Sequence, residues 1–200
     1  MRSVLTFGLV AMLALTIVSC AQPPEEELKA AEEALAKAQS AEADVYATEV
    51  YRSAKNTLDD AKSKVEKNDY EAAKSSAIRA KELADQARSQ AETNKAKTRD
   101  EAQAVINSTS SGLADARSAL NAAPQGKGAD EDLDQLRSDL AQADASISDA
   151  RSNLTSGKFK EAVASARSAE SKLGQFEGAV QTAMQKIEDW KEKNKAWYLR

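Results

Sequence analysis

The chain of 200 residues contains no histidine and a single cysteine, Cys20. Protein zinc sites are built largely from thiolate and imidazole ligands, and catalytic triads need a base such as histidine. A lone cysteine also cannot form a disulfide within the chain. We therefore predict no catalytic residue, no metal site and no cofactor. The protein is expected not to be an enzyme.

Glycine, proline and aromatic residues are also scarce, with 7 Gly, 3 Pro and 4% aromatic side chains. Glycine and proline interrupt helices, and aromatic residues are enriched in sheets. Alanine, serine and charged residues make up most of the remainder, which is typical of long helices. The composition predicts an all-α fold without a sheet.

Clustered positive charge is missing as well, and the formal net charge at pH 7 is −4. Nucleic-acid binding proteins concentrate lysine and arginine on one face or along one helix. Peripheral binding to anionic lipid through a basic face needs the same concentration. The charge balance therefore argues against both kinds of partner.

The longest apolar run covers residues 4–18, after Met1-Arg2 and before Ser19-Cys20. A spanning helix needs about 20 apolar residues, whereas a basic start, a short apolar segment and a small residue are typical of a secretory signal peptide. Ile17-Val18-Ser19-Cys20 resembles the lipobox of bacterial lipoproteins. The resemblance implies cleavage before Cys20 and acylation of its thiol and its new amine. A plain cleaved signal and an uncleaved signal anchor are the alternatives.

We accordingly expect residues 1–19 to be a signal peptide and residues 20–24 a lipidated tether, with palmitate-type chains on Cys20. Loss of Arg2, the only charged residue of the signal, changes the formal charge from −4 to −5. Two or more acyl chains anchor a protein stably in a bilayer. Residue 21 is alanine rather than aspartate, and in lipoproteins of two-membrane bacteria this resembles cargo for the outer membrane. The expected location is its periplasmic side.

From residue 25 onward, apolar residues recur every three or four positions, which predicts amphipathic helices. The pattern falters at residues 43–48, where Asp44 or Thr48 is suited to cap a new helix. At the turn 67–69, Asn68 tolerates a left-handed backbone and Asp69 is a good N-cap. Residues 25–122 are thus predicted to form a first helical hairpin region. Weak helix formers predict a bend or a short break near residues 108–112.

Residues 123–129 contain Pro124 and two glycines and form the clearest predicted loop. Residues 130–200 are predicted to form a second helical hairpin with an aromatic C-terminal segment. Its turn is expected at residues 156–158, with Gly157 in the positive-φ position at a helix end. The last apolar stripe continues as far as Trp197.

The two hairpins align with each other at an offset of 89 residues. Ala61-Lys62-Ser63 falls on Ala150-Arg151-Ser152, and the aromatic residues after the two turns, Tyr70 and Phe159, also match. We interpret this as an internal duplication, with each aromatic side chain closing one hairpin end. The hairpins are expected to pack as an elongated bundle or a coiled-coil-like array. Alanine-rich seams can close within one chain or between two, so the oligomeric state stays open.

Two short motifs extend the resemblance. Tyr46-Ala47-Thr48-Glu49 and Asn68-Asp69-Tyr70 resemble an uncharacterised family of Ala-rich helical bacterial lipoproteins, with Thr48 in place of a proline and Asn68 in place of a glycine. The resemblance covers residues 15–90 well and the remainder loosely. Some of its members continue into an outer-membrane-protein-A-like module that grips peptidoglycan, which we do not recognise in this sequence. The family implies an envelope role and supplies no catalytic residue.

Asp130, Asp132 and Asp134 imitate the first three ligands of a calcium loop. Such a loop needs glycine at its sixth position and glutamate at its twelfth, where this chain has Gln135 and Ala141. Acids at the start of a helix also stabilise its positive dipole end. We therefore interpret the three aspartates as helix-start residues.

Trp190, Trp197 and Tyr198 are the candidate interaction residues, because aromatic residues are rare and three lie in the last eleven positions beside several lysines. One interpretation is that they continue the stripe that packs on the hairpins. The other is a docking segment, either on the membrane interface or in a groove of a partner protein.

Together these features predict a non-catalytic, lipid-anchored envelope protein that acts as a periplasmic structural spacer or adaptor through helical interactions. Its expected partners are the membrane, through Cys20, and an envelope protein or a peptidoglycan-associated protein. The alternative is a binding module that takes a peptide, a glycan or a lipid into a groove between the hairpins.

Overall fold

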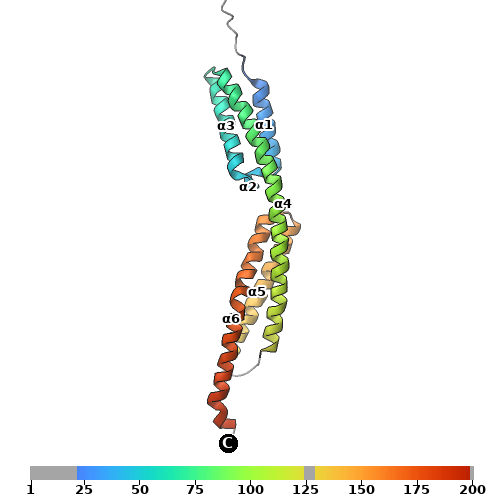
Figure 1. The fold of residues 1–200 in the computed structure, drawn as a ribbon, viewed down its shortest axis with the longest axis vertical. Coiled ribbons are helices and arrows are strands. Elements are labelled where there is room, and N and C mark those ends of the chain that lie inside the picture. The colour runs from blue at the N-terminus through green and yellow to red at the C-terminus, as the bar shows by residue number, and fades with distance from the viewer. Residues whose placement is uncertain (1–21, 124–128, 199–200) are drawn as a thin grey trace, which may run out of the picture. The chain divides into compact units, whose positions relative to one another are not determined.

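The computed structural model describes residues 22–123 and 129–198, with side chains up to Lys195. Of the described residues 92% are helical and none lies in a strand, so the predicted all-α class is confirmed. The helices are α1 (Glu25–Ser40), α2 (Ala43–Tyr46), α3 (Thr48–Glu66), α4 (Tyr70–Ala122), α5 (Asp130–Thr155) and α6 (Phe159–Tyr198) (Figure 1).

The chain divides into two compact units between Ala91 and Glu92, inside α4. Unit 1 consists of α1, α2, α3 and residues 70–91 of α4. Unit 2 consists of residues 92–122 of α4 with α5 and α6. The sequence suggested a division at the loop 123–129 instead. The division falls earlier because the second part of α4 shares its hydrophobic core with α5 and α6.

In unit 1, α3 runs antiparallel to α1 and to the first part of α4, and these two helices run parallel to each other (Figure 1). Apart from Leu58 and Tyr46, every buried hydrophobic side chain among its described residues is an alanine. Methyl side chains let helix axes approach to about 8 Å, the short end of the usual range. The buried alanines are Ala31, Ala34, Ala38, Ala43, Ala47, Ala54, Ala61, Ala73, Ala77, Ala80, Ala84, Ala87 and Ala91.

We call the contact between helices that these alanines form the alanine seam of unit 1. A polar cluster lies beside it, between α3 and α4. The hydroxyl of Ser76, which is 9% exposed, donates to Asp60 Oδ2 (2.9 Å) and accepts from Lys64 Nζ (2.8 Å). Hydrogen bonds from Lys64 and then from Ser76 lower the pKa of Asp60. On the surface, Glu32 of α1 forms an ion pair with Lys62 of α3 at 2.7 Å.

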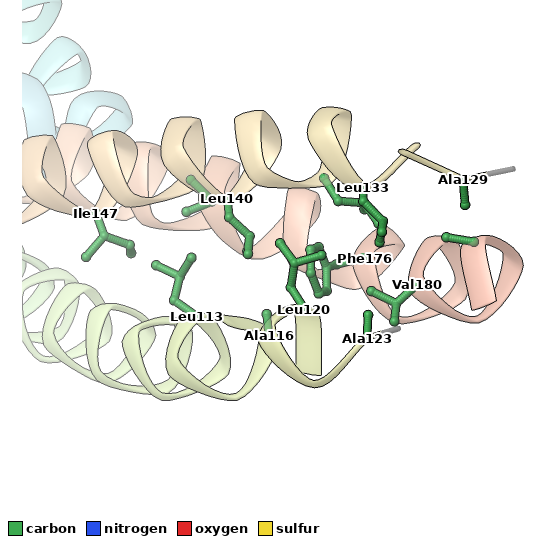
Figure 2. Close-up of a cluster of buried hydrophobic side chains, with 14 of the residues drawn as sticks. Leu113, Ala116, Leu120, Ala123, Ala129, Leu133, Leu140, Ile147, Phe176 and Val180 are labelled. Atoms are coloured by element: carbon green, nitrogen blue, oxygen red, sulfur yellow. The ribbon is translucent and has the colours of Figure 1, made fainter. Parts of the chain in front are cut away.

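Unit 2 has a core of larger side chains. Figure 2 shows Leu113 from α4, Leu133 from α5 and Phe176 from α6 pointing into one cluster. Each buried leucine or isoleucine removes more apolar surface from water than an alanine does, and contributes about 1.5–3 kcal/mol. The large buried side chains are Ile106, Leu113, Leu120, Leu133, Leu136, Leu140, Ile147, Phe176, Val180 and Ile187.

The turn between α3 and α4 has the predicted geometry. Asn68 adopts a left-handed backbone with φ of 59°. Its N–H donates to Val65 O (2.9 Å), and the N–H of Asp69 donates to Lys64 O (2.9 Å). These two bonds form the Schellman motif that closes many helices. Asp69 Oδ1 accepts from the N–H of Ala72 at 3.3 Å, which confirms Asp69 as the N-cap of α4.

The turn between α5 and α6 repeats this pattern 89 residues later. Gly157 has φ of +77°, as predicted. Its N–H donates to Leu154 O (3.2 Å), and the N–H of Lys158 donates to Asn153 O (2.9 Å). Equivalent residues thus form the same two bonds in both turns, which supports the interpretation of an internal duplication.

The aromatic residues after the two turns are only partly buried. The hydroxyl of Tyr70 donates to Asn68 Oδ1 at 2.8 Å, so this ring is attached to its own turn. Phe159 has no hydroxyl that could form such a bond. The two side chains share a position in the fold but differ in their contacts.

The predicted break at residues 43–48 is confirmed, because α1 ends at Ser40 and α3 begins at Thr48. Its chemistry differs from the prediction. Neither Asp44 nor Thr48 caps a helix, and the Thr48 hydroxyl donates backwards to Asp44 O at 2.8 Å. The chain changes direction between α1 and α2 at Glu42 instead, and the φ of Glu42, 59°, lies in the left-handed region.

Of the bend or short break expected near residues 108–112, the break is wrong, because α4 continues without interruption to Ala122. Its weak helix formers lie within a buried stripe made by Ile106, Thr109 and Leu113, each no more than 3% exposed. Tertiary packing of that stripe on α5 and α6 outweighs a propensity difference of a few tenths of a kcal/mol per residue.

The alanine seam of unit 1 generates a stability prediction. Ala54→Leu adds three carbon atoms at a position that is fully buried in α3. Overpacking a close helix contact costs about 1–3 kcal/mol. Native-state hydrogen exchange of α1 and α3 amides, which reports on unit 1 by itself, is expected to accelerate accordingly. The matched control is Ala36→Leu on the exposed face of α1, which should leave exchange unchanged. Equal protection in both variants would show that the seam has room.

Candidate functional sites

The predicted lipidation residue, Cys20, lies outside the described residues, so its acylation stays a prediction. The first described residue is Gln22. Pro23 and the buried Pro24 follow it, directly before α1. Within the described ranges no helix has both the length and the apolar character needed to cross a membrane.

The tether meets unit 1 at a polar hollow of about 760 Å³. The N-terminal turns of α1 and α4 both border it, and its lining consists of residues 22–27 with Tyr70, Glu71 and Lys74. Glu27 Oε1 and Lys74 Nζ form an ion pair across it at 2.7 Å. The hydrogen bond from Lys74 lowers the pKa of Glu27, and the same bond raises the pKa of Lys74.

The charge of this hollow is mostly negative. Glu25, Glu26 and Glu27 occupy the first turn of α1, and Glu71 occupies the first turn of α4. Carboxylates at these positions interact favourably with the positive ends of the helix dipoles. They also oppose binding of an anion. The contact that joins α1 to α4 here is the ion pair between Glu27 and Lys74.

The aromatic C-terminal segment begins where the core of unit 2 ends. Ile187 is 1% exposed and belongs to the core, whereas Trp190 is only partly buried. The side-chain amide of Asn194 donates to Trp190 O at 2.7 Å. The helix includes Trp197 and Tyr198, but their side chains lie outside the described part, so neither interpretation of the three aromatic residues is decided.

Two of the three aspartates at the start of α5 form ion pairs. Asp132 contacts Lys186 of α6 at 2.7 Å, and Asp134 contacts Arg137 of its own helix at 2.5 Å. No group of three or more potential metal ligands occurs in the part of the chain that the structure describes. The Asp132–Lys186 pair joins the beginning of α5 to α6.

Sequence analysis missed a groove on unit 2 between α4 and α6, with a volume of about 410 Å³. Its lining includes the buried side chains of Ala116 in α4 and of Phe176 and Val180 in α6, which are labelled in Figure 2. Asp115 and Glu177 lie at its edges and are exposed. The remaining lining residues are Gly112, Ala119, Leu173 and Gln181.

A local signal for this groove exists in the sequence. Gly112 lies inside a helix, where glycine costs about 1 kcal/mol relative to alanine. A Cβ at this position would lie 3.4 Å from Leu173 Cδ1, which is ordinary van der Waals contact, so glycine is not required for α4 to pack beside α6. The missing side chain leaves this part of the groove open, but it does not identify the second helix.

The Glu27–Lys74 pair generates a pH prediction. A carboxyl group whose pKa is lowered on folding adds stability above its unfolded pKa, and this contribution is lost as the pH falls through the lowered value. Lys74→Gln should raise the pKa of Glu27 towards its ordinary value and remove that part of the acid dependence. A carboxyl NMR titration measures the change. Lys81→Gln is the control, because the partner of Lys81 is Asp85 in the same helix. An unchanged Glu27 titration in Lys74→Gln would contradict the pairing.

Comparison with known proteins adds one match. Residues 26–103 match a family described as a domain of unknown function, DUF4398. No curated protein and no solved structure matches the chain. The match begins in the first turn of α1 and ends in the second part of α4, and it fits the predicted resemblance to an uncharacterised family. Over residues 26–103 the chain is therefore similar to the DUF4398 family.

Proposed function

We propose that this chain is a non-catalytic, lipid-anchored protein of the bacterial envelope. It acts on the periplasmic side of the outer membrane as a structural spacer or adaptor through helical interactions. The observation that carries the proposal is the small number of residues that separate Cys20 from the first helix in the sequence. α1 begins at Glu25, directly after the paired prolines Pro23 and Pro24.

The reach of the tether follows from chain geometry. An extended residue spans at most about 3.6 Å, so the five residues 20–24 span about 18 Å at most. Two or more acyl chains on Cys20 would hold the anchor in the bilayer stably. The hollow where α1 meets α4 would then remain within about 18 Å of the lipid. An anchor this short fits a protein whose role depends on a fixed place at a membrane surface.

The adaptor part of the proposal is supported by the helix surfaces. Long helices with charged outer faces offer extended surfaces on which other helices can pack. In unit 2, α6 continues past the core residue Ile187 as far as Tyr198. Partners are expected among envelope proteins or peptidoglycan-associated proteins.

The groove between α4 and α6 favours a second candidate function, that of a binding module. Its buried apolar lining residues and its volume of about 410 Å³ would suit part of a peptide, a glycan or a lipid. The two candidates differ in what occupies this groove. Ligand-induced shifts in the NMR signals of Gly112 and Val180 would favour the binding module.

The anchor is tested with Cys20→Ala in a two-membrane bacterial host. Mass spectrometry of the wild type should find an N-terminal peptide that begins at Cys20 and carries acyl chains. The variant should carry none and should leave the outer-membrane fraction. Recovery of wild-type protein with residues 1–19 still attached and no lipid would contradict the proposal.

Ala21→Asp is the matched control, because it leaves the acylated residue intact. The resemblance to lipoproteins of two-membrane bacteria implies that this variant is still acylated but stays in the inner membrane. Crosslinking in intact cells then tests the adaptor role. Envelope partners captured by the wild type should be lost in both variants if the function depends on the outer membrane. Retention of the same partners by Cys20→Ala would show that the anchor is dispensable for that role.

A further inference from the structure

Helix α6 extends well past the core of unit 2. Its last core residue is Ile187, and the helix continues to Tyr198, for about three further turns. α5 starts at Asp130, and Asp132 already pairs with Lys186 at 2.7 Å. We call residues 188–198 the tail of α6. Helical segments in proteins owe most of their stability to packing of one face, so the tail is a candidate for packing against another molecule.

One exposed stripe of α6 has an ordered charge pattern. Glu170, Glu177, Met184 and Lys191 follow each other at intervals of seven residues and therefore share a face of the helix. All four are exposed, and Met184, at 39%, is one of only three large hydrophobic side chains exposed in the described ranges. In the direction of the chain the stripe is acidic, acidic, apolar and basic.

The charges of this stripe have no partner in the part of their own copy that the structure describes. None of Glu170, Glu177 and Lys191 forms a hydrogen bond or an ion pair among the described residues. Neighbouring charges on other faces of α6 are paired, since Arg167 contacts Glu101 at 2.5 Å and Lys186 contacts Asp132. Glu161 and Lys193 on the opposite face of α6 also have no partner among the described residues, so what distinguishes the stripe is the order of its charges around Met184.

We propose that unit 2 pairs with unit 2 of a second copy of this chain through α6, with the two helices antiparallel about a two-fold axis at Met184. Such an axis places position 184 + n opposite position 184 − n of the other copy. Lys191 then lies opposite the partner's Glu177, and the same contact forms a second time by symmetry. The two methionines meet at the centre, where an exposed apolar side chain otherwise remains in water.

The same axis brings the tail onto the groove between α4 and α6. Glu177 forms an edge of the groove, beside Leu173 and Val180. Lysine can lay its methylene stem along an apolar surface while its ammonium group reaches a carboxylate. Lys191 and Lys195 can therefore cover the groove of the other copy, with Asp115 as a further acidic contact at its rim.

The order of the charges favours a second copy in this orientation. A parallel pair would place Glu177 against Glu177 and Lys191 against Lys191, and like charges directly opposite are destabilising. An anionic membrane surface would be repelled by Glu170 and Glu177. The stripe from residue 170 to 198 is about 42 Å long at 1.5 Å per residue. One helix pair of this length buries an area at the low end for specific interfaces, so a reversible dimer is expected.

The test uses the full chain with Met184→Cys in intact cells. Oxygen with a copper catalyst joins the two introduced thiols, one from each copy, into a disulfide, and the two protons and two electrons released pass to the oxygen. On a non-reducing gel we expect a band at twice the monomer mass, and this band should disappear when a reductant is added. Ser168→Cys, exposed elsewhere on α6, is the matched control and should give little dimer. The Cys20→Ala form of Met184→Cys should still crosslink, because the pairing rests on unit 2 and not on the anchor.

Charge reversal separates specific pairing from random collision. In the Met184→Cys background, Glu177→Lys and Lys191→Glu each turn two attractive pairs into two repulsive ones. An exposed ion pair contributes up to about 1 kcal/mol, and each variant removes two such pairs. Because about 1.4 kcal/mol corresponds to a factor of ten, each variant should lower the crosslinked fraction about tenfold. The double variant restores opposite charges and should restore the crosslink. A double variant no better than the single ones, a disulfide to a different protein, or no dimer from a folded Met184→Cys protein would each overturn the proposal.

Discussion

The spacing of apolar side chains along the helices is the constraint on which the rest of the structure depends. In every long helix, apolar residues at intervals of three and four form one stripe, and each stripe is buried against two other helices. What differs is side-chain size. The buried residues of unit 1 are almost all alanine, whereas those of unit 2 combine alanine with leucine, isoleucine, valine and phenylalanine. Close approach of the helix backbones therefore holds unit 1 together, and interlocking side chains hold unit 2 together.

Features that depend on the local backbone were predictable from the sequence. Asn68 and Gly157 are predicted at the left-handed positions because few residues tolerate them, and Asp69 is predicted as an N-cap because its side chain can reach the next turn. The left-handed Glu42 was missed, because glutamate has no such preference and the surrounding contacts impose its conformation. Thr109 illustrates the opposite case. Its segment has weak helix propensity, but its side chain is 3% exposed within a packed stripe, and the helix continues.

Features that depend on two helices at once were not predictable in the same way. The sequence identifies the pair of antiparallel helices on either side of each turn, but not the third helix that completes each unit. The buried positions of α4 step by three and four residues from Ala73 to Ala91 and resume at Ala102, one residue later than the same stepping would place them. The second part of α4 belongs to unit 2 because this displaced stripe contacts α5 and α6. The groove near Gly112 has the same origin. It forms from residues that are distant in sequence, so Gly112 in α4 does not identify α6 as the other wall of the groove.

The duplicated turns also show where the two units have diverged. The polar cluster of unit 1 links Asp60, Lys64 and Ser76, and the residues 89 positions later are Asp149, Asn153 and Ser165. Lysine has become asparagine, so the equivalent site in unit 2 lacks the cation that lowers the pKa of Asp60. With a core of large side chains, unit 2 depends less on polar contacts across its seam. On its outer surface Glu177 and Lys191 have no partner among the described residues, and opposite charges on one exposed stripe can give specificity to the recognition of another molecule.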